Sequence, residues 1–176
     1  MKIFLEKIKV VILLSMTTFL PVLASNLGGA LITATQVVSV HSMPDTNSTS
    51  KIVATVGSIG SSPSSWQTTT LSTAVNSVDN FNPLVIANTQ GNVLVVWMYV
   101  DALYIYNIAA SVLIAGNSTW STKTITKNTQ SDDSGCDDLA VFLDENGNAL
   151  IQWTEYDPNT QYTKVVAVST VLSIDT

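Results

Sequence analysis

Apolar residues follow one another without alternation from Val93 to Tyr99, and a Gly-containing turn, Asn88–Asn92, comes directly before them. β-branched and aromatic residues favour strands, and a strand without alternation is covered on both of its faces. Shorter apolar segments lie on either side, separated by polar links rich in Gly, Asn, Asp and Ser. The pattern predicts four short antiparallel strands joined by hairpins between Phe81 and Lys127, at 83–87, 93–99, 103–113 and 120–126.

The turn and the strand recur along the chain in one fixed order. The spacing from Gly91 to Gly147 equals that from Trp97 to Trp153, and Trp66 and Trp120 recur at nearly the same spacing. A strand rich in Ala and Val also recurs, at 52–56, 108–112 and 165–169. Three independent markers indicate a repeat of about 55 residues, within the range where propellers and other arrays are found.

This repeat divides the chain after residue 24 into units of about 25–80, 81–136 and 137–176. The segment Gly29–Ala34 resembles Asn148–Trp153 without the tryptophan, so we expect the strand before it to fall in the N-terminal apolar segment. The last unit ends without a fourth strand. The predicted fold is therefore all-β, a partial β-propeller of about two and a half four-stranded antiparallel blades.

A membrane helix is the alternative interpretation of Val93–Ala115, because this stretch carries only one charged residue, Asp101. The repeat argues against it. The equivalent stretch of the last unit contains Glu155, Asp157 and Lys164, which a lipid-facing helix does not tolerate. We therefore expect no membrane span in the mature chain.

The N-terminal segment 1–24 has the pattern of a signal peptide. Three lysines precede the apolar run Val10–Leu20, and small residues at Val22 and Ala24 mark a cleavage site after Ala24. An uncleaved anchor is the alternative, although the run is shorter than the roughly 20 residues that a span needs. We expect a chain that is secreted, periplasmic or held at the cell surface.

Charge and cysteine content narrow the possible partners. The chain has a net charge of −6 with seven lysines and no arginine, and removal of 1–24 leaves four lysines against twelve acids, or −8. An acidic chain without arginine has no electrostatic footprint for nucleic acid. Cys136 is the only cysteine, so no internal disulfide can form.

The densest charge is the acidic group Asp132, Asp133, Asp137 and Asp138. Carboxylate oxygens suit Ca²⁺, so this group is a candidate metal site, and Ca²⁺ is the only cofactor we consider. A solvated loop between two units is the alternative and the interpretation we favour. The same segment matches only the start of a sialidase Asp box, because the later aromatic residue is absent.

The turn Asp144–Asn148 superficially resembles a calcium loop, but its Gly is fourth rather than sixth, so we interpret it as a hairpin. His41 is the only histidine, and no nucleophile or orienting partner is marked beside it. We interpret His41 as an exposed loop residue.

Tryptophans at matched positions are candidate ligand platforms, because an indole face can stack on a sugar ring. They are Trp66, Trp97, Trp120 and Trp153. Packing between adjacent sheets is the alternative that we favour, since large aromatic side chains dominate the burial of cores.

The central unit resembles a β-propeller repeat of secreted bacterial proteins in four segments, Asn82–Ala87, Gly91–Trp97, Ile108–Ser111 and Thr119–Ser121. The segment Asp144–Ala149 fits the turn of that repeat closely. The resemblance implies the propeller fold and leaves the function open, because propellers have many unrelated activities. Members usually have more units, so the chain is expected to be either truncated or completed by self-association.

Four functions follow as hypotheses. The first is an exported, non-enzymatic binding or scaffold module with a carbohydrate or protein ligand. The second is a lectin formed when several copies close a ring, and the third is a fragment of a longer propeller protein without a function of its own. A sialidase-like hydrolase is the fourth and is disfavoured, because such sites hold the substrate carboxylate with arginines and this chain has none.

Overall fold

A computed structural model describes residues 27–45, 49–75, 77–127, 136–157, 160 and 162–171. The proposed signal peptide lies outside the described residues. The strands are β1 (Leu27–Leu31), β2 (Gln36–Pro44), β3 (Ser50–Ser58), β4 (Gln67–Thr70), β5 (Asp79–Ala87), β6 (Val93–Val100), β7 (Tyr106–Leu113), β8 (Ser121–Lys127), β9 (Cys136–Leu143), β10 (Asn148–Asp157) and β11 (Tyr162–Val171). Two short 3-10 turns, Pro63–Ser65 and Ser72–Ala74, flank β4.

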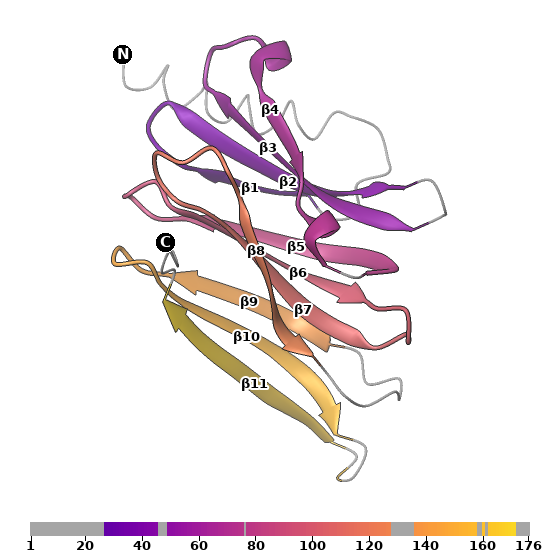
Figure 1. Cartoon of the computed structure of the whole chain (residues 1–176). Coiled ribbons are helices and arrows are strands. Elements are labelled where there is room, and N and C mark those ends of the chain that lie inside the picture. The colour runs from indigo at the N-terminus through magenta and orange to yellow at the C-terminus, as the bar shows by residue number, and fades with distance from the viewer. Residues whose placement is uncertain are drawn as a thin grey trace.

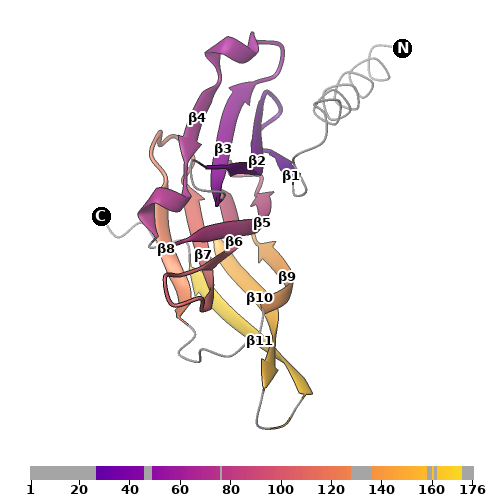
Figure 2. The same cartoon turned by 90° about the vertical axis from the view of Figure 1, so that its right-hand side faces the viewer.

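The strands form three antiparallel sheets, each made of strands that are consecutive in the chain. We refer to β1–β4 as the first sheet, β5–β8 as the second sheet and β9–β11 as the third sheet. The three sheets stack face to face, with the first at the top and the third at the bottom of Figure 1, and Figure 2 shows the same stack from the side. The prediction of an all-β chain built from antiparallel meanders is confirmed.

The second sheet confirms the four strands that the pattern predicts for the central unit. Each predicted segment overlaps its strand, with β5 four residues longer at its start and β7 three residues shorter. The Ala- and Val-rich segments are the third strand of every sheet, β3, β7 and β11. The third sheet has three strands within the described residues.

The first unit corrects the sequence-based alignment, because Gly29–Ala34 does not contain a second strand. Residues 27–31 are the first strand of a complete four-stranded sheet, so that strand does not fall in the N-terminal apolar segment. The Ile32 N–H donates to the Gln36 carbonyl at 2.9 Å, the same turn closure that Asn88 and Asn92 make in the second unit. The Thr33 hydroxyl accepts from the Gln36 N–H at 3.1 Å and holds this turn without a glycine.

Both faces of β6 are covered, as its uninterrupted apolar pattern predicts. Val93, Val95 and Trp97 belong to the core between the first and second sheets. Leu94, Val96 and Met98 belong to the core between the second and third sheets. Successive side chains of a strand point to opposite faces, so one continuous apolar strand supplies two cores.

One β-bulge recurs in the second and third sheets. The register of β5 against β6 shifts between Phe81 and Leu84, and that of β9 against β10 shifts at the same distance from the turn. Asn82 and Asp138 lie at these shifts with φ angles of 53° and 51°. Asn and Asp tolerate this left-handed conformation better than most residues, which explains their presence at both bulges.

Candidate functional site

A cleft of about 370 Å³ opens between the first and second sheets, at the end where the β1–β2, β3–β4, β5–β6 and β7–β8 connections meet. Its lining side chains are amides, hydroxyls and small or apolar groups. The polar members are Thr33, Gln36, Ser58, Ser61, Ser65, Gln67, Thr69, Gln90, Asn117 and Ser118. Trp120 is the one aromatic residue among the lining residues, and none of them is charged.

Turn geometry shapes the lower wall of the cleft. Gly91 and Gly116 have φ angles of 88° and 82°, which β-turns at these places require and which glycine adopts without strain. The Asn92 side-chain oxygen accepts from the Ala115 N–H at 3.0 Å, so the β5–β6 turn fixes the β7–β8 turn beside it. The second sheet therefore presents Gln90, Asn117 and Ser118 from two mutually supported turns.

The upper wall depends on a close approach between Gly57 and Trp66. A Cβ atom on Gly57 would lie 2.1 Å from Cδ2 of Trp66, so the indole lies directly on the glycine backbone. The Trp66 indole N–H donates to the Ser61 hydroxyl at 3.0 Å. This contact folds the β3–β4 connection back on itself and places Ser61 and Ser65 at the cleft.

The equivalent place between the second and third sheets is bridged by hydrogen bonds. The Asn88 side-chain N–H donates to the Asp144 carbonyl at 3.0 Å, and the Thr89 N–H donates to the Glu145 carboxylate at 3.0 Å. Both bonds join residues of equivalent turns, so these turns contact one another directly. In the first unit, Ile32 occupies the position that Asn88 has in the second unit and Asp144 has in the third. Thr33 likewise occupies the position of Thr89 and Glu145. Ile32 has no polar side chain for such a bridge.

The structure separates the four tryptophans into two classes. Trp97 and Trp153 are 0% and 1% exposed and belong to the two cores. They offer no free indole face to a ligand, so the packing interpretation describes them. Trp66 and Trp120 are partly exposed, and Trp120 lines the cleft.

The remaining cleft residues were not identified from the sequence. Gln36, Gln67 and Thr69 are single polar residues in a chain rich in such residues, and nothing local distinguishes them. The usable signal was the order of the turns, because connections at one end of stacked meanders come together. Residues 33–36, 57–67 and 115–120 could have been grouped on that basis.

The acidic group is only partly described. Asp132 and Asp133 lie outside the described residues, and Asp137 lies in β9. Asp138 is the bulge residue of β9, where its side-chain oxygen accepts from the Thr154 hydroxyl at 3.4 Å. No group of three potential metal-ligating side chains is found among the residues that the structure describes.

Asp144 is part of the hairpin that the sequence predicts. Its carboxylate accepts from the side-chain N–H of Asn148 at 2.7 Å and from the backbone N–H groups of Asn148 and Asn146 at 2.7 and 2.9 Å. These bonds, the Asn148 side chain first, hold the pKa of Asp144 below its usual value. The carboxylate closes its own turn, as the hairpin interpretation requires.

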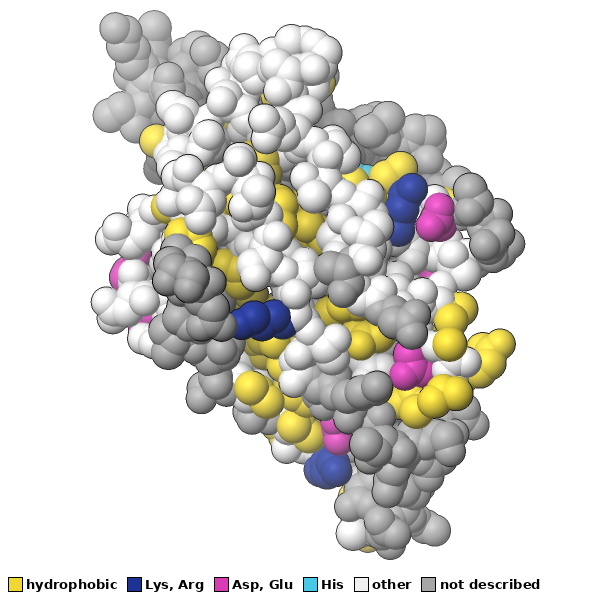
Figure 3. Space-filling model, in the orientation of Figure 1, with side chains coloured by type: hydrophobic (Ala, Val, Ile, Leu, Met, Phe, Trp, Pro, Cys, Tyr) yellow, Lys and Arg dark blue, Asp and Glu magenta, His cyan; other side chains and the backbone are white. Residues whose placement is uncertain are grey.

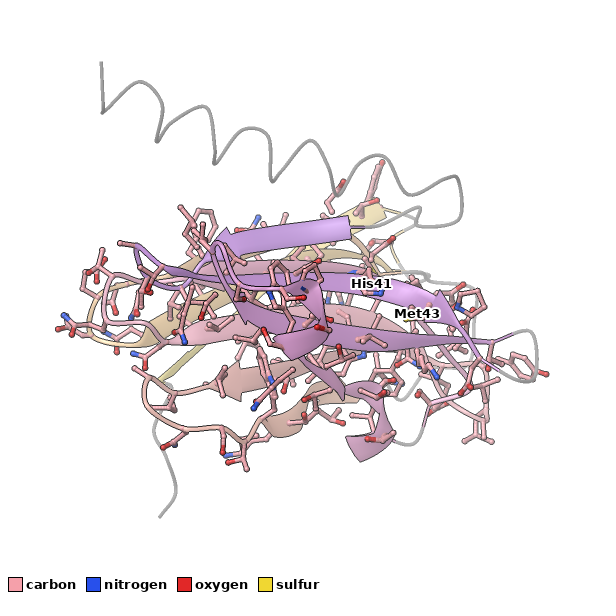
Figure 4. The ribbon with its side chains drawn as sticks, turned by 90° about the horizontal axis from the view of Figure 1, so that it is seen from above. His41 and Met43 are labelled. Carbon is pink, nitrogen blue, oxygen red and sulfur yellow. The ribbon has the colours of Figure 1, made fainter. Side chains whose placement is uncertain are left out.

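His41 is not in a loop, contrary to the sequence-based interpretation. It lies within β2 (Figure 4), at the strand position that Trp97 occupies in β6 and Trp153 in β10. Its Nδ1 atom is buried without a hydrogen-bond partner, and burial lowers its pKa from 6.5. The interpretation failed because the first unit lacks the glycine turn that aligns the other two units.

The described part of the chain contains no helix with the length and hydrophobicity that a bilayer-spanning segment needs. Comparison of the chain with known family models, curated proteins and solved structures gives no match. The resemblance to propeller repeats therefore rests on the residues of the repeat, and the structure shows the coarser arrangement of three stacked antiparallel sheets.

Proposed function

We propose that the chain is an exported, non-enzymatic binding module of β-propeller-type repeats, and that the cleft between the first and second sheets binds a neutral saccharide. The observation that supports this proposal is the set of side chains that line the cleft. Its wall combines side chains that donate and accept hydrogen bonds with one partly exposed indole, Trp120. Hydroxyl groups of a sugar match the amides and hydroxyls, and the apolar face of a sugar ring matches the indole.

The size and the electrical neutrality of the cleft support the same ligand class. A volume of about 370 Å³ is at the small end of the roughly 300–1,000 Å³ of ligand sites, which suits a short saccharide segment. A charged ligand would find no opposite charge among the lining residues. An uncharged, strongly hydrogen-bonding ligand loses least on entering such a site.

The lining also supports binding rather than catalysis. It contains no carboxylate, imidazole, thiol or amine, which are the usual general acids and bases near neutral pH. Ser58, Ser61 and Ser65 supply hydroxyls, but a serine nucleophile needs an adjacent base. Export is supported by the N-terminal pattern of lysines and apolar residues, and propeller identity by the repeat.

Intrinsic tryptophan fluorescence tests the proposal directly. We expect members of a panel of uncharged oligosaccharides of glucose, galactose, mannose and N-acetylglucosamine to shift the emission of the chain in a saturable way. Trp120→Ala is expected to abolish this response and to weaken binding at least tenfold by calorimetry. Thr69→Ala, which removes a hydroxyl from the cleft, is expected to weaken binding several-fold.

Thr68→Ala is the matched control, because Thr68 is the neighbouring residue of β4 and its hydroxyl bonds to Thr55 at 3.1 Å outside the cleft. It should bind as the unmodified chain does. Binding that survives Trp120→Ala unchanged would place the ligand elsewhere. A panel that produces no saturable response would reject the saccharide proposal.

A further inference from the structure

Each sheet of this chain has two distinct faces, which follow from the alternation of the second strand. In the second sheet the side chains of Val93, Val95 and Trp97 face the first sheet, and we call this the upstream face. The side chains of Leu94, Val96 and Met98 face the third sheet, and we call this the downstream face. The two interfaces of the stack therefore join a downstream face to an upstream face in the same way.

The downstream face of the third sheet has no covering sheet among the described residues. Phe142, Leu150 and Val165 on this face are 58%, 38% and 64% exposed. Their equivalents in the second sheet are Ile86, Leu94 and Ile108, and the last two are 0% exposed. The positions that form a core in the second sheet are thus open at the end of the stack.

The upstream face of the first sheet is open at the other end. Leu31 and Met43 on this face are 50% and 38% exposed, whereas Tyr99, the equivalent of Met43 in β6, is 5% exposed. His41 and Met43 lie on the same strand, two residues apart and therefore on this same face (Figure 4). Figure 3 shows the stack from one side, where hydrophobic side chains reach the surface in several separate places.

We propose that the chain associates head to tail, with the downstream face of the third sheet of one copy packing on the upstream face of the first sheet of a second copy. We infer that a second copy covers these faces because the same pair of faces already forms both interfaces inside the chain. Each open face has the residue positions of a face that, inside the chain, is covered by the complementary face of the neighbouring sheet. The proposal is independent of the ligand of the cleft.

Polar residues at the centres of both open faces fit one another. Gln152 and Thr154 replace the apolar Val96 and Met98 of the second sheet on the downstream face. The upstream face presents Ser39 and His41, which are both partly exposed residues. A Gln side chain both donates and accepts, so Gln152 suits a facing surface that carries hydroxyl and imidazole side chains.

A mixing experiment tests the head-to-tail arrangement. The chain, prepared with and without residues 1–24, is expected to show a concentration-dependent increase in mass by sedimentation velocity. Leu31→Lys blocks the upstream face and Leu150→Lys blocks the downstream face, so each variant alone should be monomeric. Their equimolar mixture should form a one-to-one dimer, because each variant keeps one intact face and the two faces are complementary.

Leu103→Lys is the control, since Leu103 is 73% exposed in the β6–β7 hairpin and belongs to neither face. It should associate as the unmodified chain does, and far-ultraviolet circular dichroism should show that all three variants are folded. A chain that stays monomeric at every concentration would overturn the proposal. Self-association that survives both Lys variants, or a mixture that stays monomeric, would overturn it as well.

Discussion

His41 and Trp97 occupy the same position on the second strand of neighbouring sheets, yet only the indole N–H of Trp97 has a hydrogen-bond partner, whereas Nδ1 of His41 has none. Trp97 is 0% exposed and its indole N–H donates to the side-chain oxygen of Asn80 at 3.1 Å. His41 has a buried Nδ1 without a partner. The first sheet covers Trp97 and its partner Asn80 lies in its own sheet, whereas no described sheet lies over the face on which His41 lies.

We expect the stability of the chain to fall as the pH drops below about 6.5. Burial lowers the pKa of His41 from 6.5, so the unfolded chain binds more protons than the folded chain and the free energy of unfolding rises with pH in this range. Urea denaturation at a series of pH values measures the effect. His41→Phe should flatten the profile just below pH 6.5, and a profile that keeps its slope would assign the effect to another group. Asp144, whose lowered pKa stabilises the chain above its unfolded value of 3.8, acts in a separate and more acidic range.

Asn88→Ala should destabilise the chain by about 1–3 kcal/mol, because it removes two part-buried hydrogen bonds of about 0.5–1.5 kcal/mol each. The Asn88 side chain is 5% exposed, donates to the Asp144 carbonyl and accepts from the Asn92 N–H at 3.0 Å. Asn146→Ala is the control, since Asn146 is an exposed residue of the equivalent turn and its bonds to Asp144 stay within that turn and join no other sheet. Equal urea midpoints for the two variants would contradict a bridging role for Asn88.

Gly57→Ala should cost about 1–3 kcal/mol, the usual range for forcing extra atoms into a packed site. The added Cβ would lie 2.1 Å from Trp66, so the indole must move away from the backbone. Thermal unfolding gives the stability, and the emission maximum of Trp66 should shift to longer wavelength. Gly29→Ala is the comparison, because its nearest contact would be an ordinary 3.5 Å from the Val38 carbonyl.

Asp138→Val should destabilise the chain by about 1–2 kcal/mol, the cost of a left-handed backbone for an ordinary residue. Asp138 has a φ of 51°, and a β-branched side chain makes this conformation harder to adopt. Asp138→Gly should be at least as stable as the unmodified chain, since glycine adopts positive φ freely. Chemical denaturation of both variants gives the comparison. A larger loss with glycine than with valine would show that the carboxylate, rather than the backbone, matters.

The sequence predicts the parts of the fold that depend on strand periodicity and on repeated turns. Val93–Tyr99 predicts a strand buried on both faces because both of its faces are apolar, and Gly91 and Gly147 align two units without knowledge of the structure. The first unit escaped this alignment because Thr33 closes its turn with a hydroxyl, which leaves no glycine to count from. His41 was misplaced for the same reason.

The cleft was harder to predict, because it arises from the packing of one sheet on another rather than from a local pattern. Trp120 was identified as a candidate through its recurrence with Trp66, but recurrence alone did not separate it from the buried Trp97 and Trp153. Their exposure depends on which neighbouring strand covers each indole. Gln36 and Thr69 become noticeable only when the start of β2, β4 and the β7–β8 turn are placed together.

The uniform joining of downstream faces to upstream faces also bears on how such a chain changes over evolutionary time. A duplication or deletion of one whole unit would shift everything after it by one sheet while still joining a downstream face to an upstream face at every interface. Because Ile32, Asn88 and Asp144 begin equivalent turns at equal intervals, recombination between any two of these turns would leave complete hairpins on both sides. An array of this kind can lengthen or shorten in single steps, and selection then acts mainly on its two outermost surfaces.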